Sequence, residues 1–423
     1  MMKPVLGFAG MTHLGLVSGI CAAEKGFKVI CFDLDSARIL ALGRGELPVL
    51  EPGLAELLLK NRGQLLFTSD QGKLASCDLV YIAPDAPTDD EGRSDLGPVE
   101  SMLDAVFGAT RSDAVIVILS QVPPGFTRNK QQPGRILHYQ VETLIFGRAV
   151  ERALNPERHI VGCADSKRPL PATYTAFLGA FGCPILPMRF ESAELAKISI
   201  NMCLAASIST ANTLAELCEQ IGADWSEIVP ALRLDKRIGQ HAYLVPGLGI
   251  AGGNLERDLA TICTFADALG SDAGVVRAWV ANSRHRRDWT LQTLHRTVLS
   301  KLEDPVIAVL GLAYKQDTHS TKNSPSLALL AHLTPFRVRV FDPVVSASAV
   351  TNPRCHAATS ELDACEGADV LAIMTPWEQF GRLDPSQIVR RLRGKSVLDP
   401  YAVLKTVACR AVGLEYHTLG MKS

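Results

Sequence analysis

The sequence lacks an excess of charge of either sign. Lysine and arginine together number 43 and aspartate and glutamate 44, which gives a formal net charge of −1. Proteins that bind nucleic acids or anionic membrane surfaces through electrostatics normally carry a basic excess. The basic cluster RHRR at Arg284–Arg287 is short, and we expect it to form the solvated face of a helix. The composition therefore argues against nucleic-acid and membrane partners.

The sequence also lacks the cysteine patterns of a metal site or a disulfide framework. Its eleven cysteines are an odd number, without CxxC pairs or histidines at zinc-binding spacing. We therefore expect reduced thiols and no metal. A signal peptide and an apolar run of membrane-spanning length are also missing from the pattern, so we expect a cytoplasmic protein.

What the chain does have is length and apolar content. A chain of 423 residues that is 47% hydrophobic predicts two or three domains with separate cores. The first begins with an apolar run, Pro4–Ala9, followed by GMTHLG, a helical stretch and a second strand, Lys28–Phe32, that ends at Asp33. A strand, glycine turn, helix and strand with an acid about 20 residues past the turn is typical of a dinucleotide-binding unit.

Each residue of this unit has an expected task. Gly10 permits the tight turn, Gly15 allows close helix packing, and Asp33 accepts hydrogen bonds from a ribose, which favours NAD over NADP. Thr12 stands where the second glycine normally lets the backbone approach the pyrophosphate. It either crowds the phosphate or donates a hydrogen bond to it, and a purely structural turn is the alternative interpretation.

Further strands are predicted at Leu65–Thr68, Leu79–Ala83 and Ala114–Leu119, with helical segments between them. This alternation predicts a doubly wound parallel sheet. Ligands of such sheets bind beyond the carboxyl ends of the strands. The loops APDAPTDDEGRSD and SQVPPGFT, which follow the last two strands, are therefore candidate parts of the site.

The stretch Glu191–Gly222 predicts one long amphipathic helix, with Ser192 as its N-cap and Gly222 at its end. Lys197 and Asn201 are four residues apart and share a face. A solvated pair is the simplest interpretation of these two residues alone. After a second long helix at Ser271–Leu302, strands are predicted at Pro305–Gly311, Arg337–Phe341, Val370–Thr375 and Ser396–Leu398, which indicates a second alternating lobe.

Over nearly its whole length the chain resembles the UDP-glucose/GDP-mannose dehydrogenase family. The motifs that carry the resemblance are GMTHLGLVSG, CFDLD, GELPVLEPGL, LLFTSD, SQVPPGFT, VETLIFGRAVERALNPERHIVG, AELAKISIN, KRIG, PGLGIAGGNLERD, VLGLAYKQDT, FDPVV and ADVLAIMTPW. The resemblance implies an α/β protein with two Rossmann-like doubly wound lobes joined by a long central helix and a small helical domain. It implies an NAD-binding domain at 1–190, a central helical or dimerisation domain at 191–303 and a nucleotide-sugar-binding domain at 304–423.

Members of the family are NAD-dependent and typically oxidise the C6 alcohol of a nucleotide sugar to a carboxylate in two hydride transfers. By this resemblance Glu142 helps to activate water or the hydroxyl, Lys197 and Asn201 steady the developing oxyanion, and Asp258 matches the aspartate that ends the GGSCFxKD signature. Alcohol oxidation needs a proton acceptor, a cation beside the alkoxide and fixed hydrogen-bond donors, so these residue types suit the chemistry.

The chain departs from the family at the nucleophile. Gly253 stands at the position of the signature's serine, Asn254 at its cysteine and Arg257 at its lysine, while Phe146 stands at the second glutamate of the segment that contains Glu142. An amide cannot add to an aldehyde as a thiolate does, so the covalent route to the acid should be closed. We expect a single two-electron oxidation that yields an aldehyde or a ring ketone.

The resemblance and the loop positions also supply the ligand-binding candidates. Those expected for the cofactor are Gly10, Thr12, Leu14, Gly15, Asp33, Arg38, Ala83, Ser120 and Lys322; those for the substrate are Arg237, Tyr243, Leu244, Gly247, Gly249 and Lys315. Arg237 matches an arginine that reaches a neighbouring subunit in the family, so we expect a homodimer or higher oligomer. Tyr401 stands where an arginine usually binds the substrate phosphate, which argues for an altered substrate.

Three alternatives remain open at this point. A conventional four-electron UDP-sugar 6-dehydrogenase would need a route without cysteine. A non-catalytic nucleotide-sugar-binding homologue would explain the departures at Thr12, Asp85, Ala86, Asn254 and Tyr401. A β-hydroxyacid dehydrogenase also carries lysine and asparagine on a central helix, but the second alternating lobe argues against it. The expected role is in polysaccharide or sugar-nucleotide biosynthesis.

Overall fold

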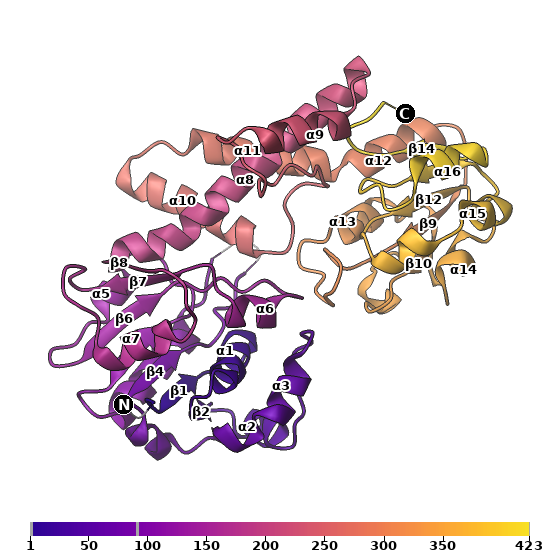
Figure 1. Ribbon diagram of the computed structural model, residues 1–423. Coiled ribbons are helices and arrows are strands. Elements are labelled where there is room, and N and C mark those ends of the chain that lie inside the picture. The colour runs from indigo at the N-terminus through magenta and orange to yellow at the C-terminus, as the bar shows by residue number, and fades with distance from the viewer. Residues whose placement is uncertain (1–2, 90–92, 423) are drawn as a thin grey trace. The chain divides into compact units, whose positions relative to one another are not determined.

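The computed structural model describes residues 3–89 and 93–422, and the chain divides into two compact units, residues 1–200 and 201–423 (Figure 1). The division falls within one continuous helix, so each unit is described by itself. Residues 90–92 of the loop APDAPTDDEGRSD lie outside the described residues. The predicted three-domain division stays a prediction.

An eight-stranded sheet forms the centre of the first unit, in the order β3-β2-β1-β4-β5-β6-β7-β8 (Figure 1). Its strands are β1 Leu6–Ala9, β2 Val29–Phe32, β3 Leu65–Thr68, β4 Leu79–Ile82, β5 Val115–Ile118, β6 Ile136–Gln140, β7 His159–Cys163 and β8 Ile185–Arg189. All neighbours are parallel except β6 and β7, which are antiparallel. The doubly wound order is confirmed, and the one antiparallel pair departs from the expected parallel sheet.

Helices cover this sheet on both faces and bury two hydrophobic clusters. They are α1 His13–Glu24, α2 Ser36–Gly43, α3 Leu54–Lys60, α4 Gly97–Ala109, α5 Phe126–Asn129, α6 Ala149–Leu154 and α7 Ala172–Gly179, with short 3₁₀ turns η1 Arg62–Gln64 and η2 Gln71–Ser76. α1, α6 and α7 contribute to one cluster, while α4 and the start of α8 contribute to the other. The central strands β1, β4 and β5 are buried along their whole length, which explains their uninterrupted apolar sequences.

The predicted long helix is α8, Phe190–Ile221. It begins directly after β8, so the predicted N-cap, Ser192, lies inside the helix and that prediction is wrong. The predicted end is confirmed: Gly222 adopts φ +83° and its N–H donates to the Cys218 carbonyl at 3.0 Å. Much of the buried face consists of small residues such as Ala205, Ala211 and Ala215.

Several large apolar side chains of α8 and the following helix are exposed instead: Leu195, Leu214, Leu217, Ile221, Ile228 and Leu234. α8 is also the one helix among the described residues whose length and composition would fit a membrane span, against the expectation that the chain has no such run. These two criteria are weak evidence, because a core helix of a globular protein meets them as well. α8 carries Glu194 and Asn201 as buried polar residues.

The second unit continues with α9 Trp225–Leu234, α10 Asn254–Leu269, α11 Gly274–Arg287, α12 Trp289–Leu294 and the π-helical turn η3 His295–Leu299. The single helix predicted at Ser271–Leu302 is therefore wrong, because the chain breaks at Asp288 between α11 and α12. The prediction that the RHRR cluster is solvated is wrong for Arg286. This side chain is 1% exposed and its guanidinium pairs with Glu216 at 3.3 Å and Glu219 at 2.8 Å.

A six-stranded sheet, wholly parallel and in the order β11-β10-β9-β12-β13-β14, completes the second unit. Its strands are β9 Val306–Leu310, β10 Arg337–Phe341, β11 Cys355–Ala357, β12 Val370–Ile373, β13 Ser396–Leu398 and β14 Glu415–His417. Its helices are α13 Pro325–His332, α14 Glu361–Cys365, α15 Pro385–Arg391 and α16 Thr406–Ala411, with 3₁₀ turns η4 Ala347–Ala349 and η5 Glu378–Arg382. Two Rossmann-like lobes and a long central helix are thus confirmed. All eleven cysteines are free thiols.

Candidate active site

The turn between β1 and α1 brings three chain segments close together. Gly10 has φ +100°, and a Cβ there would lie 2.5 Å from the Pro84 nitrogen at the end of β4. A Cβ at Gly15 would lie 2.0 Å from the Gly10 carbonyl oxygen. Neither position can hold a side chain unless the backbone moves. This steric restriction explains why glycine occupies both positions of the motif.

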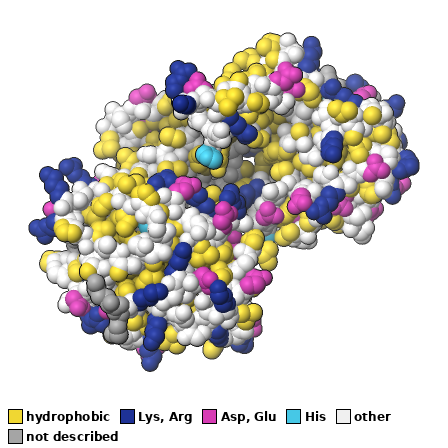
Figure 2. Space-filling model, viewed as in Figure 1, with side chains coloured by type: hydrophobic (Ala, Val, Ile, Leu, Met, Phe, Trp, Pro, Cys, Tyr) yellow, Lys and Arg dark blue, Asp and Glu magenta, His cyan; other side chains and the backbone are white. Residues whose placement is uncertain are grey.

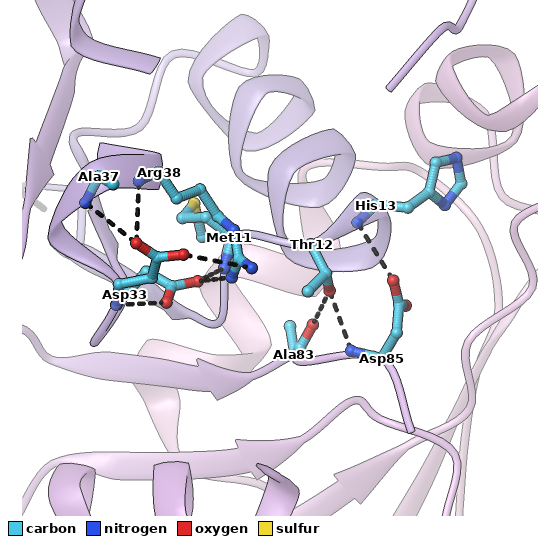
Figure 3. Close-up of polar contacts among 9 residues, drawn as sticks. Met11, Thr12, His13, Asp33, Ala37, Arg38, Ala83 and Asp85 are labelled. Carbon is cyan, nitrogen blue, oxygen red and sulfur yellow. Dashed lines mark hydrogen bonds and ion pairs between the residues drawn. The ribbon is translucent and has the colours of Figure 1, made fainter. Parts of the chain in front are cut away.

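Asp33 follows β2 and is 4% exposed. Its Oδ2 accepts the Met11 N–H at 2.6 Å and the Arg38 guanidinium at 2.8 Å, while Oδ1 accepts the Asp35 N–H at 2.9 Å (Figure 3). The carboxylate is therefore held facing the turn, in the position from which such an acid accepts a ribose hydroxyl. Arg38, on α2, pairs with it, and its role toward the cofactor stays a prediction.

Thr12 is used inside the protein. Its hydroxyl donates to the Ala83 carbonyl at 3.3 Å and accepts the Asp85 N–H at 2.9 Å, which ties the turn to the segment after β4 (Figure 3). The Asp85 carboxylate in turn accepts the N–H of His13, the first residue of α1, at 3.3 Å. Although Asp85 is exposed as a residue, loss of hydration around its carboxylate raises its pKa, opposed by Thr12 and His13.

The other expected cofactor residues of this unit are Leu14, on α1, and Ala83 and Ser120, which follow β4 and β5. Leu14 is buried in the hydrophobic cluster beneath α1, so its side chain serves packing. Ala83 is buried, and the Ser120 hydroxyl donates to the Pro84 carbonyl at 2.6 Å. A dinucleotide fits this unit at the glycine turn and at Asp33. The N-terminus of α1, which would receive the pyrophosphate, is faced by the negative charge of Asp85.

Glu142 and Lys197 form an ion pair within the first unit, Nζ to Oε2 3.3 Å. Glu142 follows β6 and its other oxygen accepts the Leu144 N–H. The two side chains are only 18% and 15% exposed, so the pair is largely shielded from water. Lys197 lies on α8, and its low exposure shows that the interpretation as a solvated side chain is wrong. A carboxylate and an ammonium are thus brought together from positions 55 residues apart in the sequence.

Two residues that sequence reasoning missed, Glu51 and His13, contact each other beside the loop that follows Glu142. The buried carboxylate of Glu51 accepts the N–H groups of Gly147 and Ala149 at 3.0 and 3.2 Å and lies 2.8 Å from His13 Nε2. The His13 ring lies 4.2 Å from that of Phe146, centroid to centroid. Glu51 thereby connects the start of α1 to the loop after Glu142. The signal was the motif GELPVLEPGL, whose second glutamate is Glu51 and had no assigned task.

Asn201 and Asp258 meet within the second unit. The Asn201 amide, 8% exposed, donates to Asp258 Oδ2 at 2.5 Å, and the Arg257 Nε lies 3.4 Å from Asp258 Oδ1. Asp258 is 1% exposed and comes from the first turns of α10. Asn201 follows Lys197 by one turn of α8, so the helix presents both residues on the same face. Asn254 is the exposed first residue of α10.

The glycine-rich segment 246–253 is fixed by neighbours in the same unit. Its Gly247 N–H donates to Asn212 Oδ1 at 2.8 Å, and its Ile250 N–H donates to the Ser283 hydroxyl at 2.7 Å. A Cβ at Gly249, where φ is +74°, would lie 2.3 Å from the Ser283 carbonyl oxygen. The segment is thus a built loop and not the flexible linker that its composition also allows.

The C-terminal lobe supplies further contacts to this loop. Tyr401 has a hydrogen bond from the Leu248 backbone, and burial raises the pKa of its phenol. Tyr314 lies against Gly252 and the Lys322 stem against Gly253, where an added Cβ would be 2.3 and 3.3 Å away. The Lys315 ammonium lies 5.8 Å from the Tyr314 ring centroid. Lys315 and Lys322 are therefore placed beside the glycine-rich loop, while Tyr401 serves to hold it.

The remaining substrate candidates are distributed differently. Leu244 is buried and its carbonyl accepts the Trp225 indole N–H at 2.7 Å. Tyr243 is 46% exposed. The Arg237 side chain is 89% exposed and pairs with Asp235 at 2.6 Å. Among residues 3–89 and 93–422, no three histidine, cysteine, aspartate or glutamate side chains gather as a metal site would require.

The sequence matches the UDP-glucose/GDP-mannose dehydrogenase family in three successive parts. The NAD binding domain matches residues 5–172, the central domain residues 191–284 and the UDP binding domain residues 308–406. The chain belongs to this family. The family assignment makes the protein an oxidoreductase that uses NAD, and the turn at Gly10 lies within the part of the chain that matches the NAD binding domain.

Relatives and solved structures agree with this assignment. The chain is 30% identical over 427 residues to UDP-glucose 6-dehydrogenase TuaD of Bacillus subtilis, covering 97% of this chain and 92% of that protein. It is 30% identical over 437 residues to UDP-glucose 6-dehydrogenase of Pseudomonas aeruginosa, covering 97% and 96%. A UDP-glucose dehydrogenase from Pyrobaculum islandicum superposes with a TM-score of 0.87 at 27% identity, covering 100% and 98%. The chain is thus an NAD-dependent dehydrogenase of the nucleotide-sugar type.

Proposed function

We propose that this enzyme carries out a single two-electron oxidation of an alcohol on a nucleotide-activated sugar and releases an aldehyde or a ketone. The observation that carries the proposal is the shielded Glu142–Lys197 pair, followed one helical turn later by the buried Asn201–Asp258 pair. These groups can handle a proton and an oxyanion. The residue at the expected position of the nucleophile, Asn254, cannot form a covalent adduct with an aldehyde.

In the proposed reaction the C–H bond of the carbinol breaks as a hydride and the O–H bond as a proton. NAD, when bound, accepts the hydride. Glu142 accepts the proton directly or through water, and the Lys197 ammonium stabilises the negative charge that develops on the sugar oxygen. Asn201 adds an amide donor that its bond to Asp258 holds in one orientation. The products are one carbonyl compound, one NADH and one proton.

A second oxidation to the acid would need a nucleophile to add to the carbonyl carbon. Cys203 is exposed on α8 and is offset from Lys197 by six residues, about 240° around the helix. Cys263 lies nine residues after Asn254 on α10, which is about 13 Å along the helix axis. Neither thiol supports a replacement for the missing cysteine. A water molecule activated by Glu142 is the competing route to a four-electron oxidation.

The proposed substrate is a UDP-sugar. The match of residues 308–406 to a UDP binding domain supports this class, as do the names of the relatives. The fixed glycine-rich loop offers backbone groups to a nucleotide sugar. Because Tyr401 supplies a phenol where the family's pattern has a guanidinium, we expect the sugar-phosphate contacts to differ from those of a UDP-glucose dehydrogenase.

We also propose that the chain acts in the cytoplasm as a homodimer or higher oligomer, without nucleic-acid or membrane partners. Exposed apolar side chains at the end of α8 and on α9 support a second copy as the partner: Leu214, Leu217, Ile221, Ile228 and Leu234. In the view of Figure 2, hydrophobic side chains are exposed over this end of the helices. Ile221→Glu should shift the protein toward monomer in light scattering after gel filtration, whereas Leu50→Glu, at another exposed leucine, should not.

A substrate screen tests the proposed reaction. The purified enzyme is incubated with NAD and a panel of UDP-, GDP- and other nucleotide sugars, with NADH absorbance and product mass as readouts. We expect NADH with UDP-sugars and a product two mass units lighter than its substrate. We also expect Asn254→Cys to leave this outcome unchanged, because Phe146 and Tyr401 remain. Formation of stoichiometric acid by that variant would show that the cysteine alone had been limiting.

A further inference from the structure

Asp85 places a negative charge at the end of the helix that should receive the cofactor's phosphates. Its Oδ2 accepts the N–H of His13, the first residue of α1, at 3.3 Å (Figure 3). The start of a helix attracts anions because its first N–H groups lack partners within the helix and carry a partial positive charge. In a dinucleotide-binding unit that anion is the pyrophosphate. In this protein the Asp85 side chain already interacts with the N-terminus of α1.

The geometry holds the backbone of Asp85 in place while leaving its side chain able to turn. The Asp85 N–H donates to the Thr12 hydroxyl at 2.9 Å, and that hydroxyl donates to the Ala83 carbonyl at 3.3 Å. The carboxylate itself accepts the His13 N–H over a long distance of 3.3 Å. Asp85 is exposed, so rotation about its side-chain bonds would carry the carboxylate into solvent.

We propose that Asp85 is an internal competitor of the cofactor's pyrophosphate, so that NAD binds only after this carboxylate leaves the N-terminus of α1 or is protonated. The proposal concerns the cofactor and does not depend on how many electrons the sugar loses. Its consequence is a dinucleotide affinity lower than the same turn would give with a neutral residue at position 85. Asp85 is then a residue that tunes affinity, while Asp33 keeps its expected role toward the adenosine ribose.

Two charged groups face Asp85 and set the direction of its pH dependence. Glu142, in the loop after β6, repels its negative charge, whereas His13, on α1, attracts it when protonated. Loss of hydration is the larger effect and raises the pKa of the Asp85 carboxyl. The carboxyl therefore stays partly protonated to a higher pH than an ordinary aspartate. Its competition with the pyrophosphate should weaken as pH falls.

Equilibrium binding of two ligands separates this effect from general damage to the site. ADP-ribose carries the pyrophosphate, whereas adenosine carries the same base and ribose without it. Titration calorimetry would compare the wild type with Asp85→Asn and Asp85→Gly, and Asp104→Asn, at an exposed position on α4, would be the matched control. We expect both variants at position 85 to bind ADP-ribose about 3- to 30-fold more tightly, with adenosine affinity unchanged. Asp104→Asn should change neither.

The pH dependence is measured as the ratio of the wild-type to the Asp85→Asn dissociation constant for ADP-ribose, because only the wild type carries the Asp85 carboxyl that titrates. This ratio should exceed one at pH 7.5 and fall toward one as the pH is lowered and the Asp85 carboxyl becomes protonated. Unchanged or weaker ADP-ribose binding by folded Asp85→Asn and Asp85→Gly, verified by thermal unfolding, would overturn the proposal. Equal tightening of adenosine would do the same, because the effect would not depend on the pyrophosphate.

Discussion

At the scale of single residues, the Glu142–Lys197 pair is the feature on which the proposed chemistry depends. The ammonium lies 3.3 Å from the carboxylate and both are largely shielded from water. In such an environment a cation stabilises a developing oxyanion far more than it would in bulk water. We therefore expect Lys197 to stabilise the transition state and not to contribute to the binding of the dinucleotide.

We predict that Lys197→Met lowers kcat about 100-fold or more, because the charge that offsets the oxyanion is lost. The affinity for ADP-ribose should stay within about twofold, since Lys197 contacts Glu142 and not the glycine turn. Initial rates of NADH formation and calorimetric titrations provide the two measurements. Lys167→Met, at an exposed lysine, is the control and should keep full activity. A Lys197→Met enzyme with normal kcat would remove this residue from the mechanism.

The residue types of this site could be predicted because they occur in motifs with fixed spacing. Lys197 and Asn201 are four apart on a helix, and Asp258 ends a signature that the resemblance supplies. The opposition of Asp85 to the start of α1 could not be read from spacing, because it depends on a loop that lies 72 residues further along the chain. Glu51 was missed for the same reason, since its partners are 38 to 98 residues away.

At the scale of elements, Glu51 joins the start of α1 to the start of α6. It accepts two backbone N–H groups and the His13 ring nitrogen from inside the protein, with its carboxylate fully buried. Such a group stabilises the loop that carries Glu142 as well as the fold around it. A substitution that removes the charge of Glu51 and keeps its shape tests this connection between α1 and α6 with little change in packing.

We predict that Glu51→Gln lowers the free energy of unfolding by about 1–3 kcal/mol, because an amide NH₂ would face backbone donors and leave them unsatisfied. Urea denaturation followed by circular dichroism measures the change. Glu56→Gln, on the exposed face of α3, should alter stability by less than about 0.5 kcal/mol. Equal stability of Glu51→Gln and wild type would mean that the loop does not depend on this carboxylate.

The strand β7 carries a buried histidine, His159, whose protonation affects the stability of the fold. His159 is 6% exposed and its Nε2 has no hydrogen-bond partner within the part of the chain that the structure describes. Burial lowers the pKa of His159 to about 4 from an ordinary value of 6.5. The unfolded chain therefore takes up a proton at a higher pH than the folded chain does. Stability contributed by the neutral ring is present above pH 6.5 and is lost as pH falls toward 4.

We predict that His159 lowers the free energy of unfolding by about 2 kcal/mol when the pH falls from 7.5 to 5. His159→Gln, which cannot titrate, should reduce the fall in stability over this range by that amount. Urea denaturation at the two pH values gives the comparison. His332→Gln, at an exposed histidine on α13, should leave the fall unchanged. The same slope in wild type and His159→Gln would show that the ring is not buried in its neutral form.

The elements themselves were predictable to different degrees. The strands β3, β10 and β13 have the bounds that the sequence predicts. β13 is buried throughout, whereas β10 alternates buried and partly buried residues and β3 lies at the edge of its sheet, so their apolar residues mark the strands without full burial. The strands β6, β7 and β8 were not predicted. β8 has an exposed and partly exposed sequence at the edge of the sheet, which leaves no continuous apolar run. The break at Asp288 was missed because it interrupts a helical pattern without proline or glycine.

At the scale of the whole molecule, two lobes of the same architecture carry different tasks. The first holds the glycine turn, Asp33 and the Glu142–Lys197 pair, and the second holds Asn201, Asp258 and the glycine-rich loop. α8 belongs to both. The fold could be predicted from the order of the motifs, whereas the outcome that we propose for the reaction rests on one position, Asn254, where the chain departs from the pattern of the family that it resembles.

The number of NADH molecules formed per molecule of sugar consumed tests this account most directly. With a limiting amount of the best UDP-sugar and excess NAD, the reaction is followed to completion and the product is weighed by mass spectrometry. We predict one NADH per sugar and a product two mass units lighter than the substrate. Two NADH per sugar, with a carboxylate as the product, would contradict the account.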